Sequence, residues 1–205
     1  MFGPLWQATR DLHHQAEYHP LARAMIAGTI TPQAWADWLH AHLTIQLALD
    51  PHLPPAVRRA DALALDLLAL LPVEARPSQV AAEFAATLTD TVAIFGAAYL
   101  TIGAHRRGGR VIEKALREAG RDLPSRHTAF DDGPAAEAFV KQLREIPDLA
   151  PGARRAFAVL TAVMDEIVAR GDFEQGCDED HATSVEAGSC LHAQMTAGPG
   201  PDATP

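Results

Sequence analysis

A histidine pair near the N-terminus, His13-His14, is the first feature of this sequence that could do chemistry. Leu5, Leu12 and the alanines between and after them recur at helical spacing and form one apolar stripe. His13 lies at the edge of that stripe, where a neutral imidazole can turn one ring nitrogen toward the core as a metal ligand. The alternative is an ordinary half-buried histidine, because imidazole is often partly buried in proteins.

A second chemical candidate is the segment 103–109, Gly-Ala-His-Arg-Arg-Gly-Gly. Each glycine inside a helix costs about 1 kcal/mol relative to alanine. Three glycines in so short a stretch predict a kink, or a place where the backbone must approach something bulky. The segment is therefore either a loop that joins two helices or a backbone ledge over a flat ligand.

The elements that must position these residues are almost all helical, because alanine and leucine dominate and runs of β-branched residues are missing. Pro20 is expected to kink or break the first helix, and Thr31-Pro32 is typical of a helix start. The expected helices span about residues 4–27, 32–50, 57–71, 78–102, 111–119, 135–146 and 151–169. The sequence therefore predicts a single all-α bundle with a binding site between facing helices.

The composition changes after the last expected helix. From Gly171 onward Gly, Ser, Asp, Glu, Thr and Pro dominate, and apolar residues lack periodicity. We expect a helical domain over residues 1–170, followed by a flexible C-terminal tail over 171–205. Cys177 and Cys190 both lie in this tail, so neither a disulfide framework nor a cysteine metal site is expected in the body of the domain.

Charge and hydropathy exclude some classes of protein. The chain has 205 residues, 48% of them hydrophobic, and a net charge of −9, whereas non-specific nucleic-acid binding usually requires a basic face. No apolar run reaches the length needed to cross a bilayer, so no membrane partner is expected. No signal peptide is visible at the N-terminus, which makes a cytoplasmic location the expectation.

The pattern Leu-x-x-Ala-Thr-x-x-x-His that ends at His13, followed by Gln-Ala-Glu, resembles the proximal helix of heme oxygenases. Tyr99, Gly103, Gly108-Gly109 and Val111-Ile112 are similar to the distal helix of that family. The resemblance implies an all-α bundle of the heme oxygenase type, in which His13 is the axial ligand of the heme iron. It also implies that Gly103, Gly108 and Gly109 let the distal backbone lie close to the porphyrin.

The distal segment departs from the family pattern in two ways. Four residues separate Gly103 from Gly108, where the family usually has three, which implies one inserted residue or a realignment that places Ala104 at the first glycine. His105 stands opposite an aspartate that many members carry. This substitution makes His105 a candidate catalytic residue or second iron ligand, and it also allows altered regioselectivity or lost turnover.

Heme carries two propionates, so the resemblance implies cations and hydroxyl groups at the rim of the pocket. The candidates are Arg10, one turn before His13, Tyr99, one turn before Gly103, and Lys141 and Arg144, on the helix where the family usually places a propionate-binding basic residue. Trp6 occupies a position where some members have lysine. For each candidate cation the alternative is a solvated surface charge.

By this resemblance the chain is expected to be a bacterial, biliverdin-producing heme oxygenase. Such an enzyme cleaves heme b, which is both substrate and cofactor, to biliverdin, carbon monoxide and ferrous iron. It uses dioxygen and electrons from an external reductase, which is a ferredoxin or a flavoprotein. A bilin-binding photoreceptor is a further partner that the resemblance allows.

Two other functions stay open at this point. One is a heme-binding or regulatory protein on the same fold that does not turn heme over, which the altered segment 103–109 motivates. The other is a non-heme di-iron oxidase of the same fold. A di-iron site of that kind would want the spacing Glu-x-x-His on facing helices, and this spacing is not found in the sequence.

Overall fold

The computed structural model describes residues 3–171 of the chain, so the predicted tail lies outside the described residues except for Gly171. The described elements are all helical, in agreement with the predicted class. The α-helices are α1 (Pro4–Glu17), α2 (Pro20–Ala27), α3 (Pro32–Leu49), α4 (Ala60–Ala69), α5 (Gln79–Ala85), α6 (Thr91–Gly103), α7 (Gly109–Glu118), α8 (Gly133–Arg144) and α9 (Ala150–Ala169). The short helical turns are η1 (Asp50–His52), η2 (Pro55–Val57), η3 (Ala104–Gly108), η4 (Arg126–Thr128) and η5 (Pro147–Leu149).

Side chains that cap helix N-termini decide where several of these helices begin. The Thr31 hydroxyl accepts the Ala34 backbone N–H at 3.1 Å, as the sequence predicts for a threonine before a proline. The Asp132 side chain caps α8 in the same way. These bonds satisfy backbone donors that have no partner inside the helix.

The first expected helix breaks before Pro20, as predicted, whereas the break in the expected helix 78–102 was not predicted. The expected helix 4–27 ends at Glu17, and the His19 side chain accepts the Leu21 N–H and starts α2. The expected helix 78–102 ends at Ala85, and the Asp90 side chain starts α6. The third expected helix, 57–71, is shorter and spans Ala60–Ala69.

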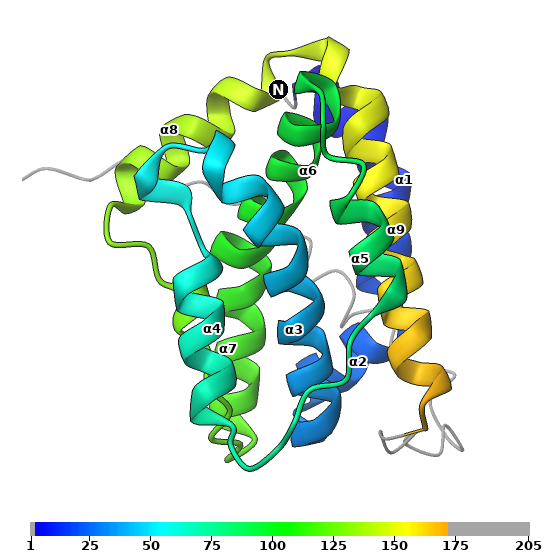
Figure 1. Cartoon of the computed structure of the whole chain (residues 1–205), viewed down its shortest axis with the longest axis vertical. Coiled ribbons are helices and arrows are strands. Elements are labelled where there is room, and N and C mark those ends of the chain that lie inside the picture. Colours follow the sequence, from blue (N-terminus) through cyan, green and yellow to red (C-terminus); the bar gives the residue numbers. More distant parts are fainter. Residues whose placement is uncertain (1–2, 172–205) are drawn as a thin grey trace, which may run out of the picture. The chain divides into compact units, whose positions relative to one another are not determined.

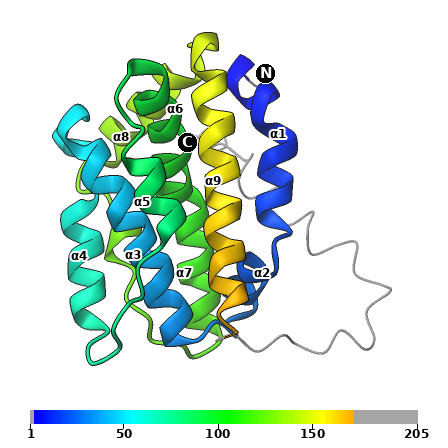
Figure 2. The same ribbon diagram turned by 45° about the vertical axis from the view of Figure 1, so that its right-hand side comes forward.

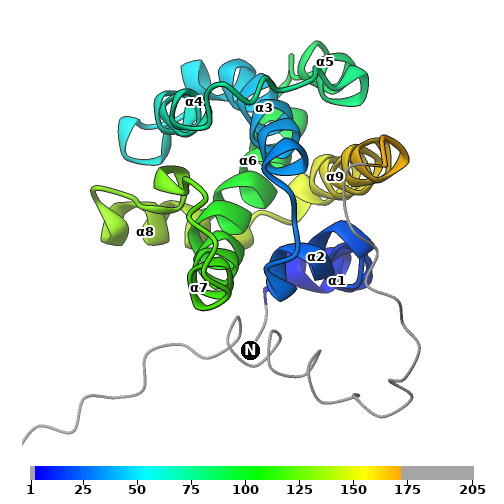
Figure 3. The same cartoon turned by 90° about the horizontal axis from the view of Figure 1, so that it is seen from below.

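The long rod formed by α6, η3 and α7 runs through the bundle (Figure 1). In the view from below, α6 lies in the middle, α3 and α4 lie to one side of it, and α1 and α2 lie to another (Figure 3). Helix α9 packs between α1 and α6 (Figure 2). Gly96 and Gly152 allow α6 and α9 to approach backbone to backbone, because a β-carbon at Gly152 would lie only 2.0 Å from the Val92 carbonyl oxygen.

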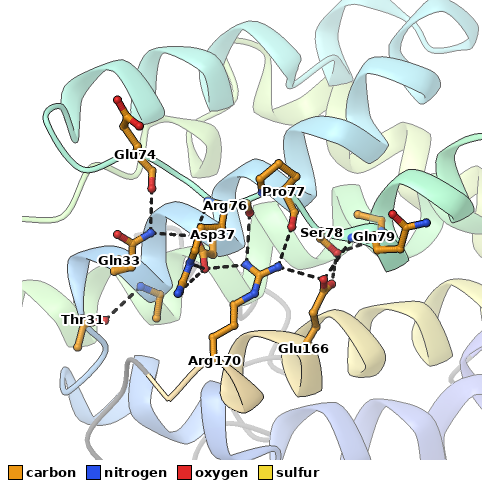
Figure 4. Close-up of polar contacts among 12 residues, drawn as sticks. Thr31, Gln33, Asp37, Glu74, Arg76, Pro77, Ser78, Gln79, Glu166 and Arg170 are labelled. Carbon is orange, nitrogen blue, oxygen red and sulfur yellow. Dashed lines mark hydrogen bonds and ion pairs between the residues drawn. The ribbon is translucent and has the colours of Figure 1, made fainter.

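A buried carboxylate joins the far end of α9 to α3 (Figure 4). Asp37 is fully buried and accepts hydrogen bonds from the backbone and side chain of Arg76, from Gln33 and from Arg170. Arg170 also donates to the carboxylate of Glu166 and to backbone carbonyls of the segment before α5. This network joins α3, the segment before α5 and the end of α9 around the charge of Asp37.

Candidate functional site

His13 lies on α1 in a partly buried position between two aromatic rings. Its ring centroid is 5.1 Å from that of Trp6, about two α-helical turns earlier, and 5.8 Å from that of Phe157 on α9. Its side chain is 16% exposed, whereas the neighbouring His14 side chain is 41% exposed. Of the histidine pair, His13 is therefore the member that the bundle holds in a defined environment.

A carboxylate supports one nitrogen of this imidazole. The Nδ1 atom of His13 lies 3.2 Å from Oε1 of Glu17, and both atoms are buried. The distance suits an ion pair, although the angles fall outside those of a hydrogen bond. Among residues 3–171 no protein group bonds to the other ring nitrogen, Nε2. Histidines that ligate metals commonly present one nitrogen in this way while a carboxylate orients the other.

The glycine segment is not a loop, because the distal rod stays helical through it. Residues 104–108 form a π-helical turn, and Gly103, Gly108 and Gly109 all have ordinary right-handed helical torsion angles. Backbone conformation therefore does not require glycine at any of these three positions. A β-carbon at Gly103 or Gly108 would meet nothing within 4 Å, whereas one at Gly109 would lie 2.7 Å from the Thr128 methyl group.

The π-turn determines how Gly103 and Gly108 lie relative to each other. A π-helix bonds residue i to residue i+5, and such turns are usually single-residue insertions into an α-helix. Consistent with this pattern, the Gly109 backbone N–H donates to the Ala104 carbonyl. Residues five apart, such as Gly103 and Gly108, thus lie on nearly the same face of the rod. We call this side, which Gly103 and Gly108 leave without side chains, the glycine face.

The consecutive helices α1 and α2 approach the distal rod at two places. The Tyr99 hydroxyl interacts with Thr9 on α1, and the backbone of Gly28 after α2 packs against Ala119 after α7. Figures 1 and 2 show that α1–α2 and α6–α7 run in the same direction. His13 is one turn beyond Thr9, and Gly103 is one turn beyond Tyr99, so the two lie at the same level on facing elements.

Cations gather at the Tyr99 end of this region. Arg144 on α8 interacts with the buried Tyr99 hydroxyl, whose pKa is raised by burial and held down in part by Arg144. The pKa of Arg107 on η3 is lowered, first by burial and then by the nearby charges of Arg144 and Arg106. Arg106 pairs with Glu137 at 3.3 Å. An anionic ligand would relieve the mutual repulsion of these guanidinium groups.

The structure brings together some of the predicted rim residues and leaves others apart. Tyr99 and Arg144 interact. Arg10 is exposed and pairs with its neighbour Asp11 at 3.2 Å, and Lys141 is also exposed. Arg107, which the sequence analysis did not assign to the rim, takes part through its position beside Arg144. Its signal in the sequence is the unusual run of two arginines between the glycines.

His105 does not lie on the glycine face. It is buried, and its ring centroid is 4.9 Å from that of His42 on α3 and 5.1 Å from that of His127 on η4. Helix α3 lies across the rod from α1 and α2 (Figure 3). As a candidate second iron ligand on the side of His13, His105 is therefore misplaced, because its ring is packed into the opposite side of the rod.

The non-heme di-iron alternative would require clustered histidine and carboxylate side chains. Within residues 3–171, no group of three or more His, Cys, Asp or Glu side chains is placed to hold a metal ion. The buried histidines touch edge to face and are not arranged around a common point.

Among residues 3–171, no helix has the length and apolar character required to cross a membrane.

Comparison with solved structures places this arrangement in a known fold. The structure of heme oxygenase from Leptospira interrogans matches 79% of this chain and 97% of its own, with a TM-score of 0.68 and 16% identity. Heme oxygenase-1 from the cyanobacterium Synechocystis, in complex with heme, matches 81% and 91% of the two chains, with a TM-score of 0.70 and 14% identity. Heme oxygenase-2 from Synechocystis, in complex with heme and NO, matches 81% and 84%, with a TM-score of 0.69 and 17% identity.

The chain thus has the all-α fold of heme oxygenases, and the predicted resemblance is confirmed at the level of the fold. No protein-family model matches the sequence, and no curated protein is significantly similar to it.

Proposed function

We propose that the chain binds heme between α1 and the glycine face of the distal rod, and that it is a biliverdin-producing heme oxygenase. The observation that carries the proposal is the pair Gly103 and Gly108. Each is unfavourable in a helix by about 1 kcal/mol, neither has a torsion angle that needs glycine, and neither contacts anything that would exclude a β-carbon. Two such residues on one face keep a surface bare for a group outside the chain.

The residues present fit heme as that group. Nε2 of His13 is available as the axial ligand, and Glu17 orients the ring through Nδ1. Tyr99, Arg107 and Arg144 form a cationic and hydroxyl-bearing end that suits carboxylates such as propionates. The relatives of known structure include two solved in complex with heme.

In this function each part of the site has a separate task. Heme supplies the iron and the porphyrin ring, and the ring is itself the substrate that is opened with dioxygen and electrons from an external reductase. His13 would fix the position of the ring plane, and the cationic end would fix its rotation in that plane. The bare glycine face would leave room for a small molecule above the ring. The products would be biliverdin, carbon monoxide and ferrous iron.

The partners that this function requires are an electron donor of the ferredoxin or flavoprotein type and, if the product supplies a pigment, a bilin-binding photoreceptor. A cytoplasmic location is part of the same proposal. We assign the catalytic role to the backbone of Gly103 and Gly108. Gly109 instead allows the rod to pack against η4.

A heme-binding protein without turnover is the second candidate, and one observation favours it. The π-turn Ala-His-Arg-Arg-Gly carries no carboxylate, so the glycine face lacks the acidic group with which many family members order distal water. Adding hemin and then a reductant in air separates the two functions. Loss of the Soret band with growth of biliverdin absorption supports the enzyme. A stable ferrous or ferric spectrum supports the binder, and no spectral change on adding hemin would overturn both.

A further inference from the structure

The ring of His13 is not held by a well-directed hydrogen bond at Nδ1. This atom lies 3.2 Å from Oε1 of Glu17, but the angles fall outside those of a hydrogen bond. The other carboxylate oxygen of Glu17 lies 3.7 Å from Nδ1 of His14, so two imidazoles share the carboxylate. The torsion that turns an imidazole about its Cβ–Cγ bond has only broad preferences of its own. Packing must therefore contribute to the rotation of the His13 ring.

Two aromatic rings supply this packing. The Trp6 ring lies 5.1 Å from the His13 ring at an interplanar angle of 63°, and the Phe157 ring lies 5.8 Å away at 55°. Side chains of an α-helix lean toward its N-terminus, which directs His13 back along α1 toward Trp6. Because Phe157 belongs to α9, the imidazole meets one ring from its own helix and one from a neighbouring helix. We call Trp6 and Phe157 the aromatic clamp.

The spacing of the aromatic clamp is fixed by the packing of α9 on α1. Phe157 is only 3% exposed and belongs to the hydrophobic core. One turn earlier on α9, Nη1 of Arg154 donates a 2.7 Å hydrogen bond to the carbonyl oxygen of Ala8. Ala8 lies between Trp6 and His13 on α1, so this bond holds the two helices together beside the clamp.

Helix α1 offers a ligand contacts of a different kind from those of the Tyr99 end. Arg10 is the only arginine or lysine within Pro4–Glu17, and its side chain is 62% exposed and pairs with Asp11. Tilted contacts between aromatic rings are favourable because the face of a ring is negative and its edge is positive. An imidazole that donates electron density to a metal cation becomes electron-poor, which strengthens its attraction to a neighbouring aromatic face.

We propose that Trp6 is a positioning residue, which with Phe157 fixes the rotation of the His13 ring and thereby the direction of Nε2. Helix α1 holds the heme through its iron, and the cations at the Tyr99 end hold its carboxylates. The inference rests on the proposed function, because it assigns Trp6 a role only if Nε2 of His13 binds the iron.

The first test reads the orientation of the imidazole ring in the hemin-loaded protein with cyanide. The spread of the heme methyl signals in the proton NMR spectrum depends on the plane of the axial imidazole. We expect Trp6→Leu to change this pattern and the conservative variant Trp6→Phe to restore most of it. Trp38→Leu is the matched control, because Trp38 is also half-buried and contacts a histidine, His42, at 4.2 Å. It should keep the wild-type pattern.

The second test compares hemin with metal-free protoporphyrin IX, which has the same carboxylates but no iron. Trp6→Leu should weaken hemin binding about fivefold, the effect expected when one aromatic pair is lost. Its affinity for protoporphyrin IX should equal that of wild type, because no bond from His13 is involved. Urea midpoints of the variants without ligand show whether each protein is folded, and Trp6→Phe is the milder change if Trp6→Leu is not.

The outcomes separate the positioning role from the proposed function. Wild-type methyl signals and hemin affinity in Trp6→Leu would overturn the positioning role and leave heme binding through His13 intact. An equal loss of affinity for hemin and protoporphyrin IX would also overturn it, because that result indicates a packing defect. A wild-type protein that does not bind hemin, or whose hemin spectrum is unchanged by His13→Ala, would overturn both the positioning role and the proposed site.

Discussion

Nη1 of Arg170, which follows α9, lies 2.8 Å from Oδ2 of Asp37 in the second turn of α3. The same carboxylate oxygen also accepts two hydrogen bonds from the Arg76 side chain, at 2.7 and 2.9 Å. Since Asp37 is fully buried, its charge depends on these arginines for compensation. Through this contact, the last described turn of α9 contributes to the stability of the whole helical domain.

Asp37→Asn should destabilise the domain by about 3 kcal/mol or more, because it leaves two arginines beside a neutral group in a buried site. Urea unfolding followed by circular dichroism measures the change. Asp61→Asn, at an exposed position in the first turn of α4, is the matched control and should cost less than 1 kcal/mol. Equal effects of the two substitutions would show that the network contributes little.

The stability of the wild-type protein should fall in acid through the same carboxylate. Burial alone would raise the pKa of Asp37, but hydrogen bonds from Arg76, Arg170 and Gln33 outweigh it and lower the pKa below 3.8. A depressed pKa in the folded state contributes stability above the unfolded value, and this is lost as pH falls through the folded value. Urea midpoints should therefore drop below about pH 4, with a smaller drop for Asp37→Asn.

A chain that ends at Gly171 should keep this network, whereas a chain that ends at Ala169 lacks Arg170 and should lose part of its stability. The two truncated proteins differ by only two residues, so their urea midpoints isolate the contribution of Arg170. We also expect the chain that ends at Gly171 to bind hemin as the full-length protein does. Loss of hemin binding in that protein would assign a role in the site to residues 172–205.

His13→Ala should change the ferric hemin spectrum and abolish turnover, whereas His14→Ala should change neither. The reason is that His13 is held between Trp6 and Phe157 with one nitrogen beside Glu17, while His14 is substantially exposed. Absorption and electron paramagnetic resonance spectra of the loaded variants measure the ligand change. The opposite result, a spectral change with His14→Ala alone, would mean that the helix presents the other histidine.

Gly108→Leu should leave the protein without heme as stable as wild type or more stable by up to about 1 kcal/mol, because leucine favours helix and its β-carbon would meet no atom within 4 Å. Hemin affinity should nevertheless fall sharply, since the side chain would occupy the glycine face. Gly109→Ala should do the reverse and reduce stability, because its β-carbon would meet Thr128. Normal hemin binding by Gly108→Leu would remove the main support for a ligand on this face.

Arg144→Gln should weaken hemin binding about tenfold, the effect expected when a charged hydrogen bond is lost. Hemin dimethyl ester, which lacks free propionates, should bind wild type and Arg144→Gln equally. Arg10→Gln is the control because Arg10 is exposed and pairs with Asp11. A tenfold loss that persists with the ester would indicate a packing defect at Tyr99 and not a lost propionate contact.

Periodicity predicted the helical class and most helices, but it could not locate the break between α5 and α6. Phe84 and Leu88 continue the apolar spacing of the preceding helix into the linker, so the pattern shows no interruption where the backbone leaves the helix. The capping signal of Asp90 is local and marks the start of α6. Here the hydrogen bond of one side chain decides a boundary that burial does not reveal.

Only the part of the site that lies within short motifs could be predicted from the sequence. His13 and the glycines lie within short motifs, and residues of one helix have predictable relative positions. His42, Asp66 and His127 are separated by many residues and meet only because α3, α4 and η4 pack around the rod. No spacing rule connects such residues, so this buried group becomes visible only in three dimensions.

The π-turn also bears on how the length of this segment could be engineered. One residue added to an α-helix rotates everything beyond it by about 100°, which would normally carry α7 out of its packing with α2. Because η3 takes up the extra residue within a single widened turn, Gly103 and Gly108 remain on one face and α7 keeps its partners. The length of this turn can therefore change by one residue while the helices on either side stay in register.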